Sequence, residues 1–292
     1  MENAGPIYHK WPASWNGLIK VMHWVGNQPV RTHRHEFIEI AFIAKGSCLH
    51  HYHGSAVRLI PGDIFVITPH EEHSYEIDGN TVIYNCMFYP QVLGEDWAKL
   101  QKVKGVYDLL IVEPFYRFES GIQEILHLSP VEAEYMESIL KRMLYEEEHP
   151  LDGSELMQKS GLITFLCTLG RTWEKQFKEN SMVYSSKRNL LADALMFIEK
   201  NIKDAIKIEE LASKAYLSPS YFRKIFKEFT GLAPIDYINQ LRISKAKQLL
   251  SDEKMPVSDV GEAVGIKDTN YFSRLFRSTV GCSPSEYRKM SE

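Results

Sequence analysis

One segment in the last third of the chain occurs twice, and this repeat limits the fold more than any other feature of the sequence. Residues 218–237 correspond to residues 268–287. The identical pairs are Tyr221 and Tyr271, Phe222 and Phe272, Phe226 and Phe276, Gly231 and Gly281, Pro234 and Pro284, and Tyr237 and Tyr287. Because the spacing of these aromatic and turn residues is kept, we expect the same small folding unit twice in succession.

Each copy has the residue pattern of a helix-turn-helix, and we expect the two units at residues 206–230 and 256–280. A short first helix is followed by a tight turn, after which Ser218 or Asp268 supplies the N-cap of the second helix. Apolar residues on this second helix recur with the spacing of a buried helical face. They are Phe222, Ile225, Phe226 and Phe229 in the first unit, and Phe272, Leu275 and Phe276 in the second.

The opposite face of each second helix carries the residue types that read base edges and phosphates in a major groove. They are Ser220, Arg223, Lys224 and Lys227 in the first unit, and Asn270, Ser273, Arg274 and Arg277 in the second. One basic helix alone is usually a solvated surface, but matching basic positions in two copies favour double-stranded DNA as the partner. The helix predicted from Pro234 to Leu250 would hold the two units about one DNA turn, roughly 34 Å, apart.

Two stretches of this region resemble the signature of the AraC/XylS family of regulators, namely Gly231–Leu250 and Gly281–Arg288. The chain departs from the family at Ile266, where Phe is usual, and at Gly261, where Ala is usual. Because both residues stay small or apolar, we expect the fold to survive. The resemblance implies a transcription regulator rather than an enzyme. Such a regulator is usually an activator that recruits RNA polymerase, is often a homodimer, and is switched by a small effector.

The first part of the chain is rich in short apolar runs typical of β-strands. Runs of this kind are Glu39–Ala44, Asp63–Thr68 and Thr81–Tyr89. Turn signals separate them at Lys45–Ser47, Pro61–Asp63 and Asp78–Asn80. Many short strands without an intervening helical pattern predict a barrel or sandwich over about the first 120 residues.

A helical period begins near residue 129, where Ser129 and Glu132 form a capping-box pattern. A second helix is expected after Asp152 or Ser154. These two helices either cover the barrel or form a dimer seam, and the pattern leaves both open. We therefore predict an α+β protein of two domains. A cupin-like barrel with two following helices spans 1–180, a polar linker follows at 179–187, and an all-α double helix-turn-helix domain spans 188–292.

Nine of the eleven histidines lie in the first 73 residues, and four residues among them and nearby resemble the two cupin motifs. They are His33, His35, Glu39 and His73. Alternate residues of a strand share a face, so His33 and His35 point the same way. Three imidazoles and a carboxylate suit a divalent transition metal, and the same groups can instead hydrogen-bond an organic effector. For His50, His51 and His53, a purely structural role is the default interpretation.

The N-terminal pattern is also similar to the sensors of rhamnose-type sugar operons, especially at Phe37–Ile40, His73–Tyr75 and Asn85. The resemblance implies a sugar as effector. Sugar pockets combine hydrogen-bonding side chains with an aromatic platform, for which Trp24, Tyr75 and Tyr84 are the candidates.

Composition agrees with a regulator of this kind. The chain has 292 residues and a net charge of −4, yet its last third is mildly basic, as expected of an end that binds a polyanion. The four cysteines are scattered, no apolar run is long enough to span a bilayer, and no signal peptide is visible. We therefore expect a cytoplasmic protein with free thiols and no membrane partner.

Three functional hypotheses remain open at this point. The leading one is an effector-controlled DNA-binding activator, in which the occupied barrel changes how the DNA-binding units are held. The alternative is a metal-dependent cupin enzyme with an accessory DNA-binding domain. A third is a regulator whose barrel only dimerises. Stoichiometric metal with substrate turnover would favour the second, and DNA affinity that ignores every ligand would favour the third.

Overall fold

The structure is a computed structural model that describes residues 7–9, 18–52, 54–120, 125–177, 191, 193–230, 232–250 and 255–291. The chain divides into two compact units. The first comprises Met1–Leu128 and Tyr135–Ser186, and the second comprises Ser129–Glu134 and Lys187–Glu292. The linker predicted at 179–187 lies outside the described residues, as does His53.

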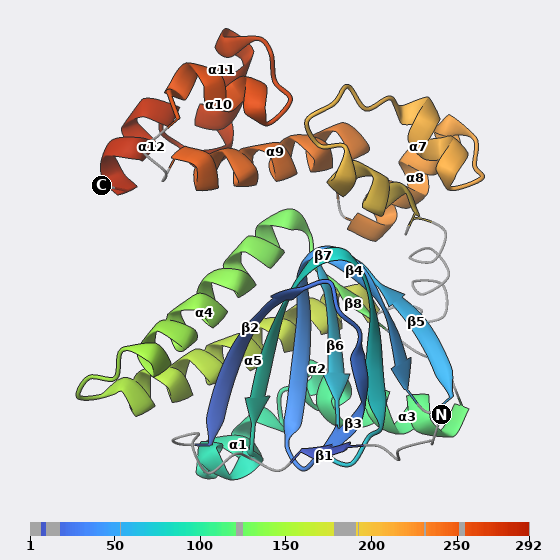
Figure 1. Ribbon diagram of the computed structural model, residues 1–292, viewed down its shortest axis with the longest axis vertical. Coiled ribbons are helices and arrows are strands. Elements are labelled where there is room, and N and C mark those ends of the chain that lie inside the picture. The colour runs from blue at the N-terminus through green and yellow to red at the C-terminus, as the bar shows by residue number, and fades with distance from the viewer. Residues whose placement is uncertain are drawn as a thin grey trace. The chain divides into compact units, whose positions relative to one another are not determined.

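The first unit is built on a sheet that, among the described residues, has eight strands (Figure 1). The strands are β1 (Ile7–His9), β2 (Ile19–Gly26), β3 (Val30–His35), β4 (Ile38–Tyr52), β5 (Ser55–Leu59), β6 (Asp63–Ile67), β7 (His73–Phe88) and β8 (Leu126–His127). The main path is β1-β3-β7-β4-β6-β8, while β2 pairs with β7 and β5 with β4. The two long strands β4 and β7 pair with each other and with β2, β3, β5 and β6, while β1 pairs with β3 and β8 with β6 (Figure 1).

Two of the three predicted turn signals do not reverse the chain. Lys45–Ser47 lies inside β4 and Asp78–Asn80 inside β7, where the pairing of the two strands changes register. Gly46 has a φ of 74°, and a Cβ there would lie 2.8 Å from the carbonyl oxygen of Asn80. The Thr81 hydroxyl donates to the Ser47 carbonyl at 3.0 Å. Glycine in these runs thus marks an irregularity between paired strands, because it permits close backbone approach.

Alternate residues of the strands point into the interior of the sheet and form its core. Ala41 and Ile43 of β4 and Ile83 of β7 are buried there. Other members of this core are Cys48, Tyr52, Leu59, Phe65, Ile67, Tyr75 and Ile125, and Trp24, Val30, Val57 and Ile77 pack against it. The predicted barrel-like β architecture is confirmed by this arrangement.

Residues after β7 are helical, so the prediction of β structure as far as residue 120 is wrong in its last part. The elements are the 3-10 helix η1 (Pro90–Leu93), α1 (Glu95–Leu100), α2 (Lys104–Tyr107), the π-helix η2 (Asp108–Val112) and α3 (Glu113–Ser120). Leu93 of η1, Leu100 of α1 and Val106 of α2 are buried, so each of these short helices contributes an apolar residue to the packing. A Cβ on Gly105 would lie 1.9 Å from the Gly170 carbonyl oxygen, so this packing requires glycine.

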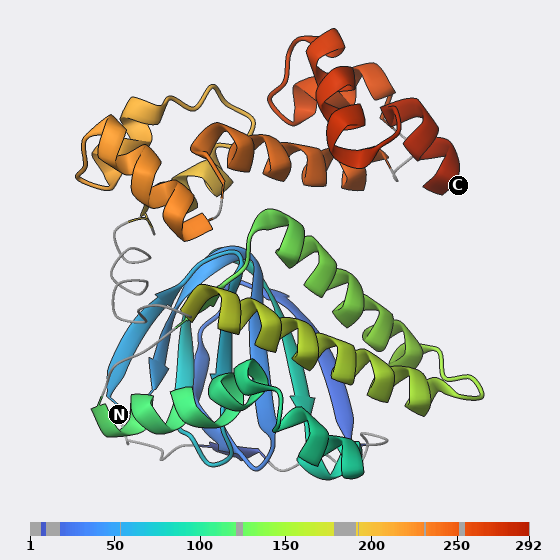
Figure 2. The ribbon, with the colours of Figure 1, turned by 180° about the vertical axis from the view of Figure 1, so that it is seen from behind.

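The two helices predicted after residue 129 are α4 (Pro130–Glu148) and α5 (Ser154–Phe177), which lie along one side of the sheet (Figure 2). The capping box at the start of α4 is confirmed, since the Ser129 amide donates to Glu132 Oε2 at 2.9 Å and the Glu132 amide donates to Ser129 Oγ at 3.4 Å. The Tyr84 hydroxyl of β7 donates to Glu137 of α4 at 3.3 Å. The helices thus cover the face of the sheet opposite to its core.

The second unit is helical throughout its described part. Its elements are α7 (Ile208–Lys214), α8 (Pro219–Thr230), α9 (Pro234–Leu250), α10 (Val257–Ala263), α11 (Thr269–Val280) and α12 (Pro284–Ser291), and residues 193–200 form a further helix. The pairs α7–α8 and α10–α11 are the two predicted helix-turn-helix units, and α9 has the predicted bounds. In the part of the chain that the structure describes, no helix is long and apolar enough to cross a membrane.

The two helix-turn-helix units resemble each other in structure as they do in sequence. The rings of Phe226 and Tyr237 are 5.3 Å apart, and those of Phe276 and Tyr287 are 5.6 Å apart, both edge-on. Each helix-turn-helix core therefore includes an aromatic residue from the helix that follows it. The predicted N-cap Asp268 accepts a hydrogen bond from the Tyr271 amide at 2.9 Å.

Candidate functional site

A cluster of three histidines and one glutamate, all buried except the half-buried His33, lies at one end of the interior of the sheet. It contains His33 and His35 of β3, Glu39 of β4 and His73 of β7, the four residues predicted from the sequence. The His33 and His73 rings are 4.1 Å apart and the His35 and His73 rings 5.2 Å apart. His35 Nε2 lies 3.4 Å from Glu39 Oε2 without the alignment of a hydrogen bond. The four residues that the sequence grouped thus lie close together in the structure.

The three imidazoles of the cluster are held in the same way by the backbone. Nδ1 of His33 lies 2.9 Å from the Arg31 carbonyl, and Nδ1 of His35 lies 2.9 Å from the Phe37 carbonyl. Nδ1 of His73 is 3.3 Å from the Glu71 carbonyl. Since a carbonyl can only accept, Nδ1 carries the proton in each case and Nε2 keeps its lone pair.

Burial favours the neutral form of His33 and His73. Desolvation is the largest cause that lowers the pKa of His33, and it lowers the pKa of His73 well below the usual value. The neighbouring histidines lower both pKa values further. The cluster therefore offers Nε2 lone pairs and a carboxylate, all of which are acceptors or metal ligands.

The interior continues from the cluster to His50 and Tyr75, and the first of these was missed by sequence reasoning. His50 is fully buried, stacks on Tyr75 with ring centroids 4.6 Å apart, and lies 5.6 Å from the His73 ring. Its neighbour His51 points outward and pairs with Glu76 at 2.9 Å. The alternation of β4 could have separated the two histidines, because only one of them can face the core.

Several buried polar atoms of the interior have no hydrogen-bond partner among the described residues. They are Nε2 of His35 and His73, both ring nitrogens of His50, the Tyr75 hydroxyl and Oδ1 of Asn85. Buried polar groups are normally paired, because leaving one unpaired costs about 1–3 kcal/mol. A group of such atoms facing one interior indicates a place for a polar ligand, water or an ion.

Three members of the cluster have the donor set of a metal site. The nearest ligand atoms of His35, Glu39 and His73 all lie within 4.8 Å of one another. Backbone carbonyls orient the two imidazoles through Nδ1, which is the usual outer-shell arrangement around a metal-bound histidine. His33, the fourth predicted ligand, lies beside His73 with ring centroids 4.1 Å apart but is not among the three residues whose ligand atoms converge. The residues present therefore fit a divalent transition metal.

A buried arginine closes the interior on the side of α3. Arg117 forms salt bridges with Glu113 at 2.9 Å and with Glu71 at 3.1 Å, and it donates to the Val66 carbonyl at 2.9 Å. Its guanidinium lies over the Phe65 ring, 4.4 Å from the centroid. Two carboxylates neutralise this arginine, so it fixes the floor of the interior rather than attracting an anion.

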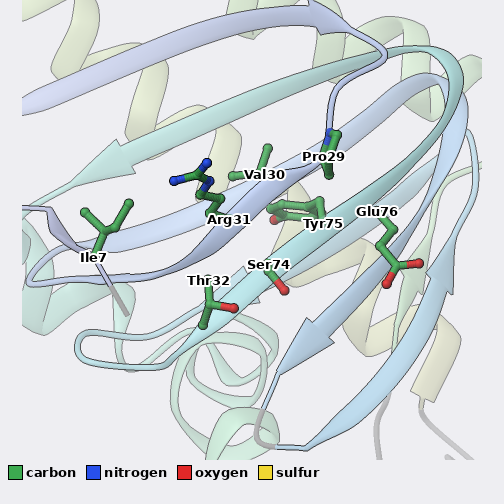
Figure 3. Close-up of a pocket in the computed structure, with 8 residues that line it drawn as sticks. All are labelled: Ile7, Pro29, Val30, Arg31, Thr32, Ser74, Tyr75 and Glu76. Atoms are coloured by element: carbon green, nitrogen blue, oxygen red, sulfur yellow. The ribbon is translucent and has the colours of Figure 1, made fainter. Parts of the chain in front are cut away.

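A cavity of about 330 Å³ opens beside β3 and β7 (Figure 3). It is lined by Ile7, Pro29, Val30, Arg31, Thr32, Ser74, Tyr75 and Glu76. Here β3 shifts register against β7 between Val30 and His33, so the strands separate locally. Arg31 and Ile7 lie on one side of the cavity and Glu76 on the other (Figure 3). Since Tyr75 lines the cavity and also stacks on His50, the cavity and the interior share this residue, whereas the four cluster residues are not part of the lining.

The other two predicted aromatic residues lie in different places. Trp24 packs against the interior core and lies opposite Ile83 in the pairing of β2 with β7. Tyr84 faces the other side of the sheet, where its hydroxyl donates to Glu137 and its ring stacks on His23 at 4.7 Å. The structure thus separates Tyr84 from the other predicted effector residues, because strand neighbours of Ile83 point away from the core.

The residues predicted to contact DNA lie on the outer face of the second helix of each unit. Those on α8 are Ser220, Arg223, Lys224 and Lys227, all exposed, and those on α11 are Asn270, Arg274 and Arg277, exposed, and Ser273, partly exposed. Phe222, Phe226, Phe272 and Phe276 of the opposite faces are fully buried. Tyr221 and Tyr271, identical in the repeat, are also exposed on these helices, a signal that the sequence reading did not use.

Comparison with known proteins accounts for both units. Residues 26–107 match the family described as AraC-like ligand binding domain, and residues 211–290 match the family described as Helix-turn-helix domain. The chain belongs to the AraC/XylS family. This assignment confirms the family resemblance drawn from the repeat.

Curated relatives of this AraC-family protein extend over nearly its whole length. It is 27% identical over 257 residues to the HTH-type transcriptional activator RhaS of Escherichia coli O1:K1, covering 88% of this chain and 87% of the relative. It is 26% identical over 268 residues to the HTH-type transcriptional activator RhaR of Pectobacterium atrosepticum, covering 90% of this chain and 87% of the relative. Among solved structures, the C-terminal domain of the response regulator yesN from Fusobacterium nucleatum is 30% identical, with a TM-score of 0.32 over 36% of this chain and 98% of that one.

These relatives decide between two of the functional hypotheses. They are transcriptional activators and not enzymes, so the AraC-family chain is an effector-controlled DNA-binding activator. The alternative of a metal-dependent cupin enzyme is not supported. The chemical identity of the effector stays a prediction, and so do the residues that contact the effector and the DNA.

Proposed function

We propose that this AraC-family activator switches on transcription when a small neutral polyhydroxylated molecule, a sugar, occupies the interior next to Tyr75. One observation carries the proposal: the interior is rich in polar atoms that have no hydrogen-bond partner among the described residues. Sugar hydroxyls both donate and accept, so they can pair with the lone pairs and also with the N–H of the neutral His50 ring, whereas an anion would face the Glu39 carboxylate and several lone pairs. The sequence resemblance to sensors of rhamnose-type sugar operons supports the same ligand class.

The cavity beside β3 and β7, which shares Tyr75 with the interior, also has room for a small ligand. Its volume of about 330 Å³ falls at the lower end of the range for small-molecule sites, roughly 300–1,000 Å³. Trp24 packs against the interior core of the sheet and offers an apolar ring face, while the histidines of the interior offer polar atoms. In this proposal His33, His35, Glu39, His73 and Tyr75 bind the effector together with His50, while Tyr84 does not.

The remaining parts of the proposal concern partners and domains. Residues 1–180 would act as sensor and dimerisation domain of a homodimer, and residues 188–292 as the DNA-binding domain. Bound effector would shift the population toward states in which the DNA-binding domains engage DNA and RNA polymerase together. Such a regulator works where the chromosome is, in the cytoplasm.

A thermal-shift panel tests the effector class directly. The melting temperature of the full chain is measured against neutral monosaccharides, the corresponding sugar acids and phosphates, each with and without a chelator. A rise with one neutral sugar, growing with its concentration as binding to the folded state requires, would support the proposal. A rise only with anionic ligands would contradict it, and so would DNA affinity that no ligand in the panel changes.

We also propose that the same cluster can hold a divalent transition metal through His35, Glu39 and His73, with His33 as a fourth ligand. The carrying observation is the common separation of at most 4.8 Å between the three ligand atoms. A metal there would offer open coordination positions to hydroxyl groups of the effector.

The metal is tested by measuring the metal content of the purified full chain and its melting temperature before and after chelation. The variant His35→Gln should lose the metal, whereas His51→Gln, which changes the outward-facing neighbour of His50, should keep it. Zinc or nickel that fails to bind at micromolar concentration would contradict the metal site without affecting the proposal of a sugar effector.

A further inference from the structure

Helix α9 belongs to both helix-turn-helix units at once. Tyr237 near its start packs against Phe226 of the first unit, with ring centroids 5.3 Å apart. Ile243, Ala246 and Leu250 farther along are buried in the core of the second unit. One helix therefore connects two separate cores, and the contacts away from its axis decide whether the units can twist about it.

The loop before α7 is such an off-axis element, and it belongs to the first helix-turn-helix unit. It follows the helix at residues 193–200, in which Leu195 and Ile198 are buried. Lys214 of α7 lies over the Phe197 ring of this helix, 4.1 Å from its centroid. The loop itself begins at Ile202, which is also buried. This packing fixes the loop to the first unit.

Arg242, in the middle of α9, is hydrogen-bonded to this loop. Its Nε donates to the Ile202 carbonyl at 3.0 Å, and its Nη2 donates to the Asp204 carbonyl at 2.7 Å. The side chain is partly buried. A guanidinium presents its donors in a rigid fork, so two bonds fix both the distance and the orientation of the loop.

Gly265 of the second unit contacts the same loop from the other side. A Cβ on Gly265 would lie 2.7 Å from the Lys203 carbonyl oxygen and 2.8 Å from that of Ile202, which no side chain could occupy without a shift. Gly265 lies in the turn between α10 and α11 and has a φ of 85°. The loop of the first unit thus packs against the turn of the second.

The repeat shows that the turn alone does not require glycine. The equivalent position in the first unit is Tyr216, which has a φ of 56° and a side chain that is 91% exposed. Both turns close with the same hydrogen bond, from Leu217 to Ala212 at 2.9 Å and from Ile266 to Gly261 at 2.8 Å. The same turn therefore accepts a tyrosine in one unit, and glycine is needed at 265 because of the contact with the loop.

We propose that Arg242 and Gly265, closing on the loop Ile202–Asp204, form a clasp that sets the distance and rotation between the two DNA-reading helices α8 and α11. Both are positioning residues and touch no DNA in this proposal. The clasp makes the protein selective for the spacing between the two DNA boxes that the units read. One added base pair moves the second box along and around the duplex, since a turn takes about 10 base pairs.

The experiment uses the full chain and DNA that it selects itself. A random double-stranded library is enriched on the wild-type protein, and the resulting two-box duplex is remade with one base pair inserted between the boxes. Dissociation constants for both duplexes and for random DNA are measured by fluorescence anisotropy. The readout is the spacing ratio, the dissociation constant for the inserted duplex divided by that for the selected one.

Arg242→Gln and Gly265→Ala should each lower the spacing ratio by about tenfold while affinity for random DNA stays the same. Arg242→Lys, which keeps the charge and one donor, should fall between wild type and Arg242→Gln. Arg288→Gln is the matched control for the arginine, because Arg288 also donates to two carbonyls, those of Leu250 and Met255, but within the second unit. Tyr216→Gly is the control for the turn.

Neither control should change the spacing ratio, even where it lowers the melting temperature. Equal loss of affinity on both duplexes in the Arg242 and Gly265 variants would overturn the clasp and leave these residues a structural role. The two variants disturb the clasp from opposite sides, so a variant that fails to fold still leaves the other to decide. Failure of the wild type to enrich any two-box DNA would contradict DNA recognition by the repeat itself.

Discussion

Tyr75 and Tyr84 lie on the same strand, β7, but face opposite sides of the sheet. Tyr75 is buried in the interior core, and its hydroxyl has no hydrogen-bond partner among the described residues. The Tyr84 hydroxyl donates to Glu137 on α4. Burial raises the pKa of both phenols, so both stay protonated donors at neutral pH. One strand thus supplies a candidate ligand contact and a structural contact of the same chemical kind.

Removing the Tyr75 hydroxyl should separate stability from ligand binding. We expect Tyr75→Phe to stabilise the unliganded protein by about 1 kcal/mol, because it removes a buried unpaired polar group. The same change should weaken effector binding by about 0.5–1.5 kcal/mol through the loss of one hydrogen bond. Melting temperatures with and without effector measure both effects. Tyr84→Phe, the matched control, should leave effector affinity unchanged, and equal effects of the two changes would remove Tyr75 from the site.

Acid should destabilise the first unit through His50. Desolvation, with Arg117 and nearby histidines adding to it, holds the pKa of His50 well below its ordinary value of 6.5 in the folded protein. Below pH 6.5 the unfolded chain therefore takes up a proton that the folded chain does not. The stability contributed by His50 is complete above that pH and declines by at most about 1.4 kcal/mol per pH unit below it.

Melting curves between pH 7.5 and 5.5, with chelator present throughout, measure this dependence. His50→Phe keeps the aromatic stack on Tyr75. It should reduce the slope of the unfolding free energy against pH by the contribution of one proton, at most about 1.4 kcal/mol per pH unit. His51→Phe, which changes the partly exposed neighbour, is the matched control. A profile that His50→Phe leaves as steep as the wild type would show that other groups cause the acid sensitivity.

The salt-bridged Arg117 should matter far more to stability than an exposed arginine. Arg117→Met leaves Glu71 and Glu113 buried beside Phe65 without a positive charge, which we expect to cost about 3–5 kcal/mol. Arg58→Met breaks a half-exposed pair with Asp78 at 3.6 Å and should cost under about 1 kcal/mol. Calorimetric melting compares them. Similar shifts in both variants would mean that the Arg117 cluster adds no stability.

The second recognition helix should read sequence through Arg274. We expect Arg274→Ala to weaken binding to the selected DNA by about 1–3 kcal/mol if its guanidinium contacts a base edge. An equal loss on random DNA would instead indicate a phosphate contact. Arg142→Ala, which removes an exposed arginine of α4 in the first unit, controls for the lost charge. Wild-type affinity should also fall steeply with salt, and a flat salt profile would contradict the basic faces of α8 and α11.

Local sequence signals predicted the helical, C-terminal part of the chain well. The i, i+3, i+4 spacing of Phe222, Ile225 and Phe226, with the N-cap at Asp268, acts over one or two helical turns. Pro234 and Leu250 bound α9 as the sequence predicted. Such signals need no knowledge of distant residues. The sequence did not predict the helices between β7 and α4, because their segments are short and their apolar residues pack against α5.

In the first unit the sequence named the residue types of the site, but only the tertiary structure decided which of them meet. His33, His35, Glu39 and His73 could be grouped from their motifs, whereas His50 joins them only because β4 pairs with β7. Reading Asp78–Asn80 as a turn broke β7 into two strands and hid the alternation that separates Tyr75 from Tyr84. Helix signals come from residues that are close together in the sequence, so the sequence by itself determined the double helix-turn-helix. Which face of a strand is inside depends on pairing between residues far apart, and that register is fixed only when the whole sheet forms.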